Sequence, residues 1–369
     1  MPVPRVAVLG LGAFGRNHLR VYGELQAAGA CRLVAAVDPV ATAREAAAGS
    51  YGIPVYASVE ELLDACRHGV LALDAASVCV PTVAHAAVAG ELLRAGVDVL
   101  VEKPFAATLA QADALLALAA ENARIVQVGH LERFNPAVSR AVELRTRPLF
   151  FEVHRLSLFT PRSLDVDVVL DLMIHDLDIV LTLADSPVRE LHAVGLPVLS
   201  QKVDIANVRL EFESGAVANL TASRVSTEQV RKLRFFQPRQ YISLDFARQE
   251  IFSIDVDAAL LAGSMSLSRA ADKTSAAPAF TVGAANPETH PSTGLALHRF
   301  PVERAEPLRL EVQDFLRAVS TRTPPRVTAE AGRNALALAL RIDQAIEDHS
   351  ACVLREEHVA GGEKKLPQM

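Results

Sequence analysis

The chain has 369 residues, more than one ordinary domain of about 100–200 residues, so its length predicts two domains. Its 37 Lys and Arg against 43 Asp and Glu give a net charge of −6, which argues against DNA, RNA or an anionic membrane surface as a partner. Hydrophobic residues make up 50% and charged residues 22%, as in a folded globular protein. The expected partners are small molecules.

The cysteines and the N-terminus bear on the cellular compartment. Four scattered cysteines without a C-x-x-C pair favour a reducing cytoplasm over a disulfide framework or a cysteine zinc site. No H-E-x-x-H or comparable ligand cluster occurs, so no metal site is predicted. The first residues lack a signal peptide's basic start, and no apolar run reaches the roughly 18–20 residues that cross a bilayer. We expect a cytoplasmic protein that does not enter the membrane.

In the first third of the chain, short runs that are apolar on both faces alternate with segments of helical composition. Such runs occupy residues 5–10, 33–38, 75–80, 97–101 and 125–128. Capping boxes at Ser58–Glu61 and Thr108–Gln111 mark two helix starts. This alternation predicts right-handed βαβ units and a Rossmann-type, doubly wound parallel sheet, in which ligands bind beyond the carboxyl ends of the strands.

From about residue 130 the pattern becomes that of an α+β domain. A helical stretch at 133–144 precedes alternating segments at 149–159, 192–199, 207–212, 216–225 and 233–245. Successive strands without helices between them predict a large, mainly antiparallel open sheet, with a hairpin turn at Glu213–Gly215. We therefore expect domains at 1–129 and 130–369. The second is predicted to contain a loop insertion at 256–294 and closing helices at 311–319 and 329–347.

A Gly-rich turn follows the first predicted strand. In Gly10-Leu11-Gly12-Ala13-Phe14-Gly15, the first glycine makes the tight turn, the second lets the backbone approach a pyrophosphate, and the third lets helix and strand pack closely. Asp38 ends the second predicted strand, where its carboxylate can accept hydrogen bonds from the adenosine ribose. The motif alone is weak, but its place between strand and helix predicts a dinucleotide site rather than a structural turn.

Asp38 also bears on the choice of cofactor. Its carboxylate repels a 2′-phosphate, and the following Pro39 and Val40 offer no cation to bind one. The sequence favours NAD over NADP, while the nearby Arg44 keeps NADP open.

Two further motifs carry potential acid/base chemistry. Lys103 of Glu102-Lys103-Pro104, at a strand end, would reach the crevice over the nicotinamide, although the motif alone could be a surface ion pair. If residues 168–178 are helical, Asp171 and His175 share one face, and a histidine is suited to taking a proton from an alcohol. His175 could also serve only as a cap or a core contact. The other histidines considered are interpreted as structural: His18, His68, His130 and His154.

These motifs together resemble the Gfo/Idh/MocA oxidoreductase family over nearly the whole chain. The resemblance implies a Rossmann domain that binds NAD(P), a second domain with an open sheet face, and a substrate between them. It implies that Lys103 orients substrate and nicotinamide, that His175 is the acid/base, and that Asp171 positions the sugar or the histidine. It further implies a set of residues that line the cofactor: Val80, Pro81, Thr82, His85 and Glu102.

The segment from Val128 to Pro136 is similar to one in UDP-N-acetylglucosamine 3-dehydrogenases and related UDP-aminosugar enzymes. This resemblance implies NAD-dependent oxidation of the C3 hydroxyl of UDP-N-acetylglucosamine, with a partner aminotransferase making a 3-amino sugar for lipid A or another surface glycan. A diphosphate needs cations, so Arg133 and Arg155 are expected to bind it, with Asn135 also in the substrate site. Weaker candidates, which could equally be solvated strand faces, are Arg162, Arg231, Lys232 and Arg234.

Two alternatives stay open. One is a dehydrogenase of a free sugar or a cyclitol such as inositol. The other is a non-catalytic, NAD-sensing regulator on the same scaffold, against which the presence of Lys103, Asp171 and His175 argues. An open sheet with one apolar face must be covered, so a homodimer or homotetramer is expected.

Overall fold

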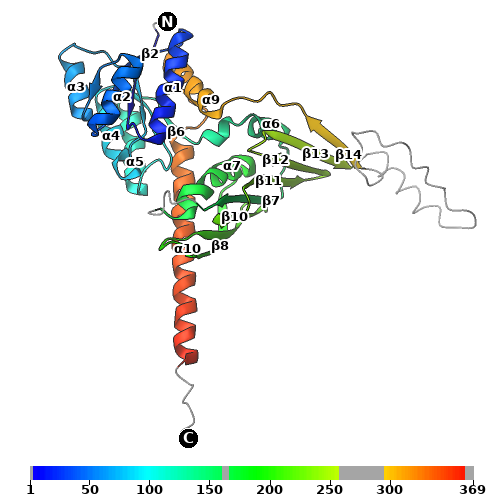
Figure 1. The fold of residues 1–369 in the computed structure, drawn as a ribbon. Coiled ribbons are helices and arrows are strands. Elements are labelled where there is room, and N and C mark those ends of the chain that lie inside the picture. Colours follow the sequence, from blue (N-terminus) through cyan, green and yellow to red (C-terminus); the bar gives the residue numbers. More distant parts are fainter. Residues whose placement is uncertain (1–2, 160–165, 257–294, 362–369) are drawn as a thin grey trace, which may run out of the picture. The chain divides into compact units, whose positions relative to one another are not determined.

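A computed structural model of the chain describes residues 3–159, 166–256 and 295–361 (Figure 1). The chain divides into two compact units, one formed by residues 1–135, 163–179 and 305–369 and the other by 136–162 and 180–304. This composition differs from the predicted continuous domains 1–129 and 130–369. The physical reason is the packing of helix α9 (Pro307–Thr321), which lies against α1 (Ala13–Ala27) of the first unit.

The first unit contains a six-stranded parallel sheet in the order β3-β2-β1-β4-β5-β6. Its strands are β1 (Arg5–Leu9), β2 (Arg32–Val37), β3 (Val55–Tyr56), β4 (Ala75–Val78), β5 (Asp98–Glu102) and β6 (Val126–Gly129). The doubly wound sheet is confirmed, with β3, a strand of two residues, as its unpredicted member. The strand order reverses between β1 and β4, and in such a sheet this switch point is where ligands bind.

Five helices connect these strands: α1, α2 (Ala41–Tyr51), α3 (Val59–Arg67), α4 (Thr82–Arg94) and α5 (Leu109–Glu121). Both predicted caps are present, since Ser58 Oγ accepts from Glu61 N at 3.3 Å and Thr108 Oγ1 from Gln111 N at 3.2 Å. The strands are buried on both faces as expected: Val6 and Val8 pack with Phe315 of α9, and Ala7 and Leu9 belong to the core on the other face.

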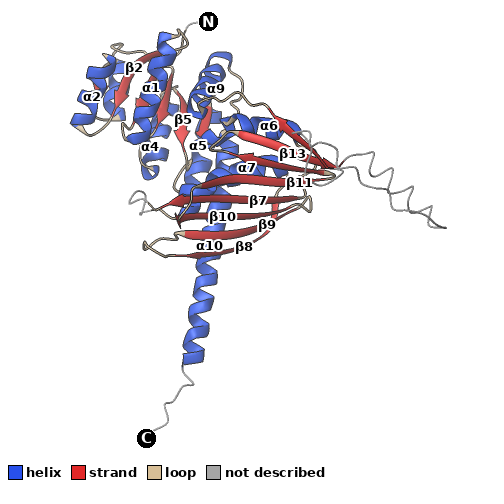
Figure 2. Cartoon of the chain, turned by 45° about the vertical axis from the view of Figure 1, so that its right-hand side comes forward, coloured by secondary structure: helices blue, strands red, loops and turns tan. Residues whose placement is uncertain are grey.

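The second unit contains an eight-stranded sheet in the order β14-β13-β12-β11-β7-β10-β9-β8 (Figure 2). Its strands are β7 (Phe150–Leu158), β8 (Val188–Leu196), β9 (Ile205–Phe212), β10 (Val217–Ser226), β11 (Val230–Gln237), β12 (Gln240–Asp245), β13 (Glu250–Val256) and β14 (Leu295–Phe300). All pairs are antiparallel except β7 with β10, which confirms the mainly antiparallel sheet.

Three features of this sheet differ from the sequence prediction. The expected strand 233–245 is two strands, because Arg239 adopts a left-handed φ of 66° and turns the chain. Strands β13 and β14 were not predicted. Residues 257–294, which make up nearly all of the predicted loop insertion, lie outside the described residues.

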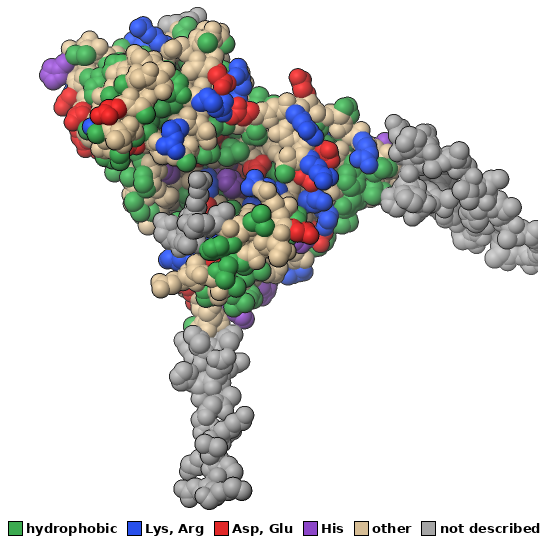
Figure 3. All heavy atoms as spheres, in the orientation of Figure 1, with side chains coloured by type: hydrophobic (Ala, Val, Ile, Leu, Met, Phe, Trp, Pro, Cys, Tyr) green, Lys and Arg blue, Asp and Glu red, His purple; other side chains and the backbone are tan. Residues whose placement is uncertain are grey.

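Other expectations for the fold of the second unit are met. Gly215, with a φ of 83°, closes the hairpin between β9 and β10. Alternate strand residues such as Phe151 and Val153 are buried, and α6 (Pro136–Leu144) packs against β12 and β13. Figure 3 shows acidic and basic side chains interspersed on the visible face of this unit. Among the described helices, none is long and apolar enough to cross a membrane.

Candidate active site

The three glycines of the Gly-rich turn have different surroundings. Gly10 has a φ of 88°, and a Cβ there would lie 2.6 Å from the carbonyl oxygen of Cys79. A Cβ on Gly15 would overlap the carbonyl oxygen of Gly10, whereas a Cβ on Gly12 would meet nothing within 4 Å. Gly10 and Gly15 are therefore required by packing, while Gly12 leaves its backbone open to an incoming group.

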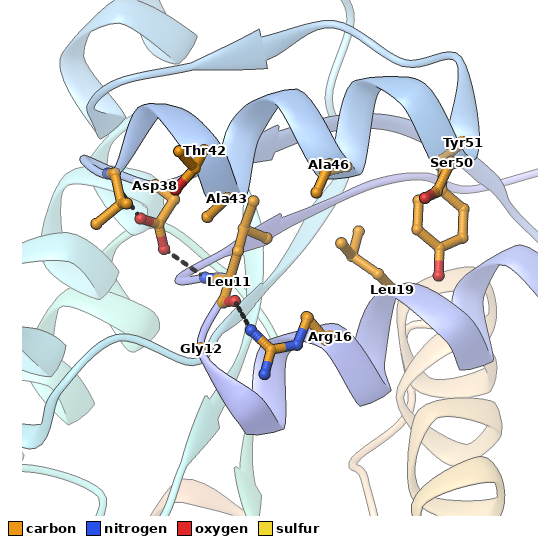
Figure 4. A pocket seen from close by; sticks show the side chains of 12 residues that line it. Leu11, Gly12, Arg16, Leu19, Asp38, Thr42, Ala43, Ala46, Ser50 and Tyr51 are labelled. Atoms are coloured by element: carbon orange, nitrogen blue, oxygen red, sulfur yellow. Dashed lines mark hydrogen bonds between the residues drawn. The ribbon is translucent and has the colours of Figure 1, made fainter.

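The turn opens onto a cavity of about 530 Å³ beside helix α1 (Figure 4). Gly12 is the N-cap of α1, and no side chain caps this helix. The cavity is lined by the turn, by Asp38 and by apolar side chains of α1 and α2 such as Leu19 and Ala46. A helix N-terminus without a side-chain cap presents backbone N–H groups to an anion, so the place suits a phosphate.

Asp38 joins the turn to the end of β2. Its Oδ2 accepts from Leu11 N at 2.6 Å and its Oδ1 from Val40 N at 2.8 Å. A carboxylate oxygen has two lone pairs, so each can accept a further hydrogen bond, as a ribose hydroxyl requires. Arg44 Nη1 donates to the carbonyl oxygens of Asp38 at 2.7 Å and Pro39 at 2.9 Å, which holds a cation beside this carboxylate.

These residues fit a dinucleotide. The glycine that faces the cavity is the one whose backbone must approach a pyrophosphate, and the uncapped helix end meets its charge. An acidic residue stands at the end of the second strand, where a ribose would lie.

The loop after β4 and the turn after β5 are tied together by His85. Its buried ring pairs through Nε2 with the carbonyl oxygen of Val80 at 2.9 Å and through Nδ1 with that of Pro104 at 2.8 Å. Val80 and Thr82 are half-buried and Pro81 is exposed. The two hydrogen-bond contacts give His85 a structural role, because they link the two loops. Direct contacts of Val80, Pro81, Thr82 and His85 with a cofactor stay predictions.

Lys103, in the turn after β5, contacts Asp171. The Lys103–Pro104 peptide bond is cis. Lys103 Nζ donates to the backbone carbonyl oxygen of Asp171 at 2.7 Å and lies 3.6 Å from its carboxylate oxygen Oδ1. Both side chains are half-buried, so this is a contact at a partly desolvated surface rather than a freely solvated ion pair.

The predicted helix that carries Asp171 and His175 is confirmed. It consists of a π-helical turn η2 (Val169–Met173) followed by α7 (Ile174–Ala184). Asp167 Oδ1 accepts from the backbone N of Val169 and of Leu170, each at 2.9 Å, and so caps the helix start. The π turn and this cap were not predicted. A single π turn within a helix is frequent at functional sites.

His130, which is interpreted as structural in the sequence although it lies in the segment Val128–Pro136, is found beside His175. It follows β6, is 1% exposed, and its ring centroid is 6.3 Å from that of His175 with the two planes at 90°. Burial lowers the pKa of His130. The residue is thus a neutral imidazole next to the candidate base. The spacing of the two histidines in the chain carries no periodic signal that could have paired them.

The residues predicted to bind substrate lie in different surroundings. Arg133 Nη1 donates to the buried Asp178 Oδ1 at 3.1 Å, and buried Asn135 donates through Nδ2 to Glu132 Oε2 at 3.2 Å. Arg155, buried in the second unit, lies 5.3 Å from the ring centroid of Phe246. Their contacts with substrate stay predictions.

Of the four weaker candidates for binding a diphosphate, three lie among the residues that the structure describes. Arg234 Nη1 pairs with Glu152 Oε2 at 2.8 Å across neighbouring strands. Arg231 and Lys232 lie half-buried on the same strand, β11. Arg162 lies outside the described residues.

A buried polar network behind the Lys103 turn was missed in the sequence. His18 Nε2 pairs with Glu102 Oε1 at 3.0 Å, His18 Nδ1 with Ser77 Oγ at 3.1 Å, and Ser77 Oγ with the Tyr22 hydroxyl at 2.8 Å. A Cβ on Gly129 would lie 2.8 Å from Glu102 Oε1, so only glycine leaves room for this carboxylate. Helix α1 therefore anchors the residue that precedes Lys103.

Glu311 of α9 is a second buried acid near Glu102. It is 0% exposed, and neither carboxylate oxygen hydrogen-bonds to another described residue. Burial, with the neighbouring charge of Glu102, raises its pKa well above its ordinary value. Burial thus favours the protonated, neutral form of Glu311 in the folded protein.

A Glu311→Gln substitution is expected to stabilise the protein at neutral and alkaline pH. The folded state keeps a proton on Glu311 that the unfolded state releases above its ordinary pKa, so stability falls as pH rises, by up to about 1.4 kcal/mol per pH unit. Glutamine is neutral at all pH values. Urea unfolding across about pH 5 to 8 should show a gain that shrinks toward pH 5. The exposed Glu330→Gln is the control, and a pH-independent difference would contradict the assignment.

Comparisons with known proteins identify the family of the chain. Residues 4–130 match the family described as "Oxidoreductase family, NAD-binding Rossmann fold", and residues 146–239 match the GFO/IDH/MocA C-terminal domain. The UDP-N-acetylglucosamine 3-dehydrogenase of Acidithiobacillus ferrooxidans is 32% identical over 93% of this chain and 97% of its own. The scyllo-inositol 2-dehydrogenase (NAD(+)) of Bacillus subtilis is 28% identical over 60% of this chain and 68% of its own.

Solved structures show the same fold. That of the Acidithiobacillus ferrooxidans enzyme has a TM-score of 0.79 at 31% identity, covering 94% of this chain and 99% of its own. The myo-inositol 2-dehydrogenase of Lactobacillus plantarum has a TM-score of 0.72 at 17% identity, covering 94% and 98%. The expected family resemblance is confirmed by the domain matches and by the relative that aligns along nearly the entire chain. The chain therefore belongs to the Gfo/Idh/MocA family of oxidoreductases.

Proposed function

We propose that this protein is an NAD-dependent dehydrogenase that oxidises the C3 hydroxyl of UDP-N-acetylglucosamine to a ketone. The observation that carries the proposal is the contact of Lys103 with Asp171 on the helix that also presents His175. The substrate is inferred from the UDP-N-acetylglucosamine 3-dehydrogenase that aligns with 93% of the chain.

The chemistry needs a hydride acceptor, a base and a group that stabilises charge on oxygen. NAD⁺, when bound, supplies the hydride acceptor. His175 takes the proton of the hydroxyl, because an imidazole is the side chain best suited to general-base catalysis near neutral pH. The Lys103 ammonium stabilises the negative charge that develops on the same oxygen. A base acting without this cation would leave that charge uncompensated.

Asp171 holds the Lys103 ammonium in place. The 2.7 Å contact with the backbone carbonyl fixes the ammonium position, and the carboxylate at 3.6 Å adds an opposite charge. This arrangement restricts the flexible side chain of Lys103. Glu102, anchored by His18, fixes the backbone that immediately precedes the lysine.

A panel of substrates tests the proposal. The purified protein is incubated with NAD⁺ or NADP⁺ and with UDP-N-acetylglucosamine, other UDP-sugars, free sugars or inositols, and NAD(P)H absorbance is followed. We expect turnover with UDP-N-acetylglucosamine and NAD⁺. Turnover with inositols alone would favour the cyclitol alternative, which the match to scyllo-inositol 2-dehydrogenase supports. Tightly bound cofactor without turnover on any substrate would favour the regulator.

The proposed preference for NAD over NADP rests on Asp38. An Asp38→Asn variant is expected to lose this preference. Asparagine keeps an acceptor for Leu11 N but removes the charge that repels a 2′-phosphate, beside the guanidinium of Arg44. The ratio of kcat/KM for NAD over NADP should fall about 10-fold, equivalent to about 1.4 kcal/mol. The exposed Asp64→Asn is the control. An unchanged ratio would mean that Asp38 does not select the cofactor.

The open face of the second unit's sheet supports self-association as a further part of the proposal. Phe150, Phe236, Tyr241 and Phe252 form a continuous row of ring contacts across four strands, with Phe236 37% exposed. Such an apolar row is stabilised when a second copy covers it. Light scattering should give a homodimer or homotetramer. A 3-keto sugar product would then be a substrate for an aminotransferase in the cytoplasm.

A further inference from the structure

His130 combines complete burial with unused hydrogen-bonding capacity. Both ring nitrogens are inaccessible to solvent, and neither hydrogen-bonds to another residue in the described part of the chain. A neutral imidazole always carries one N–H donor and one acceptor nitrogen, and burying them unpaired costs free energy. A phenylalanine would fill the same space without that cost. A histidine here therefore indicates a ligand or a function.

The surroundings of His130 place that function at the candidate active site. The ring of His175 is perpendicular to it at a centroid distance of 6.3 Å. The charged groups that act on His130 are Lys103 and Arg133, which oppose its protonation, and Asp178 and Glu102, which favour it. Burial has the largest effect and keeps the ring neutral. His130 can thus donate one hydrogen bond and accept another, but it is a poor final acceptor for a proton.

We propose that His130 is a positioning residue for His175, which it holds through one bridging water molecule. The inference rests on the proposed function, because it assigns a role in the acid/base step of that reaction. Neither His130 nitrogen hydrogen-bonds to another described residue, and a buried water, which both donates and accepts, would satisfy one of them and reach the neighbouring His175 ring. Which nitrogen of His175 carries its proton depends on the hydrogen bond that the other nitrogen makes.

Three variants test this role. His130→Phe keeps the ring and its volume but lacks the nitrogens, and His130→Asn keeps a donor and an acceptor without the ring. His68→Phe, at an exposed histidine in the same unit, is the matched control. Nitrogen NMR of histidine-labelled protein reports the tautomer and titration of His175, with and without NADH. Steady-state kinetics report kcat and KM.

We expect His130→Phe to change the tautomer population of His175 and to lower kcat by about 10-fold to 100-fold, while the dissociation constant for NADH stays within about 2-fold. His130→Asn should recover part of kcat, and the control should match the wild type. An unchanged His175 signal in His130→Phe, or an unchanged kcat, would overturn the proposal.

Two measurements decide the role of His130 even if the proposed function fails or the His130→Phe variant does not fold. If the wild type turns over no UDP-sugar, the proposed function fails, while the NMR comparison still decides the role of His130. If His130→Phe does not fold, a high-resolution crystal structure of the wild type decides instead. A water within hydrogen-bond distance of both rings supports the proposal, and two rings with no water between them overturn it.

Discussion

Replacement of His175 by alanine is expected to lower kcat by about 10²-fold to 10⁴-fold, the usual contribution of a positioned base. The imidazole lies on the helix that Lys103 contacts, and no other histidine shares a helix face with Asp171 in the described chain. NADH binding should stay nearly intact, because the Gly-rich turn and Asp38 lie on other elements. Steady-state kinetics with UDP-N-acetylglucosamine and fluorescence titration with NADH measure the two quantities.

Two further substitutions sharpen this test. Lys103→Met should lower kcat as well, because it removes the cation that stabilises charge on the substrate oxygen. Asp171→Asn should have a smaller effect, since the backbone carbonyl that accepts from Lys103 at 2.7 Å is retained. Full turnover in the His175→Ala variant would sink the assignment of the base.

Alanine at Gly15 and alanine at Gly12 are expected to fail in opposite ways. A Cβ on Gly15 would overlap the carbonyl oxygen of Gly10, which is backbone and cannot move aside cheaply. Overpacking of a close helix–strand contact costs about 1–3 kcal/mol or more, so this variant should be much less stable or insoluble. A Cβ on Gly12 meets nothing within 4 Å, so that variant should fold normally.

The Gly12→Ala variant should instead bind NADH about 10-fold or more weakly, because its methyl group occupies the space that a pyrophosphate needs. Thermal unfolding and fluorescence titration separate the two effects. A Gly12→Ala protein with unchanged affinity would show that the pyrophosphate does not approach this glycine. A Gly15→Ala protein as stable as the wild type would show that α1 can shift away from the turn.

Local patterns in the sequence predict most of the first unit. Strands such as β1, apolar on both faces, and capped helix starts such as Ser58 depend on spacing within one element, which the sequence displays directly. The same holds for Asp171 and His175, which a single helix brings onto one face. The Gly-rich turn can also be recognised, because its three glycines stand at a fixed spacing within six consecutive residues.

The second unit is harder to predict. The turn between β11 and β12 depends on Arg239 in a left-handed conformation, which its residue type does not announce. Strand β14 pairs with β13 across residues 257–294, and no local pattern specifies such a partner. The closing helices are predicted as helices, but only their apolar contacts with the parallel sheet assign them to the first unit.

What the sequence determined by itself was the chemistry available: a dinucleotide turn, a lysine at a strand end, and a carboxylate and an imidazole on one helix. Only the tertiary structure decided how these groups are supported. His18 behind Glu102, buried Glu311, and His130 beside His175 join residues from distant segments. Their proximity follows from the packing of helices on a sheet, and that packing depends on the summed burial of many apolar residues rather than on the spacing of the polar ones.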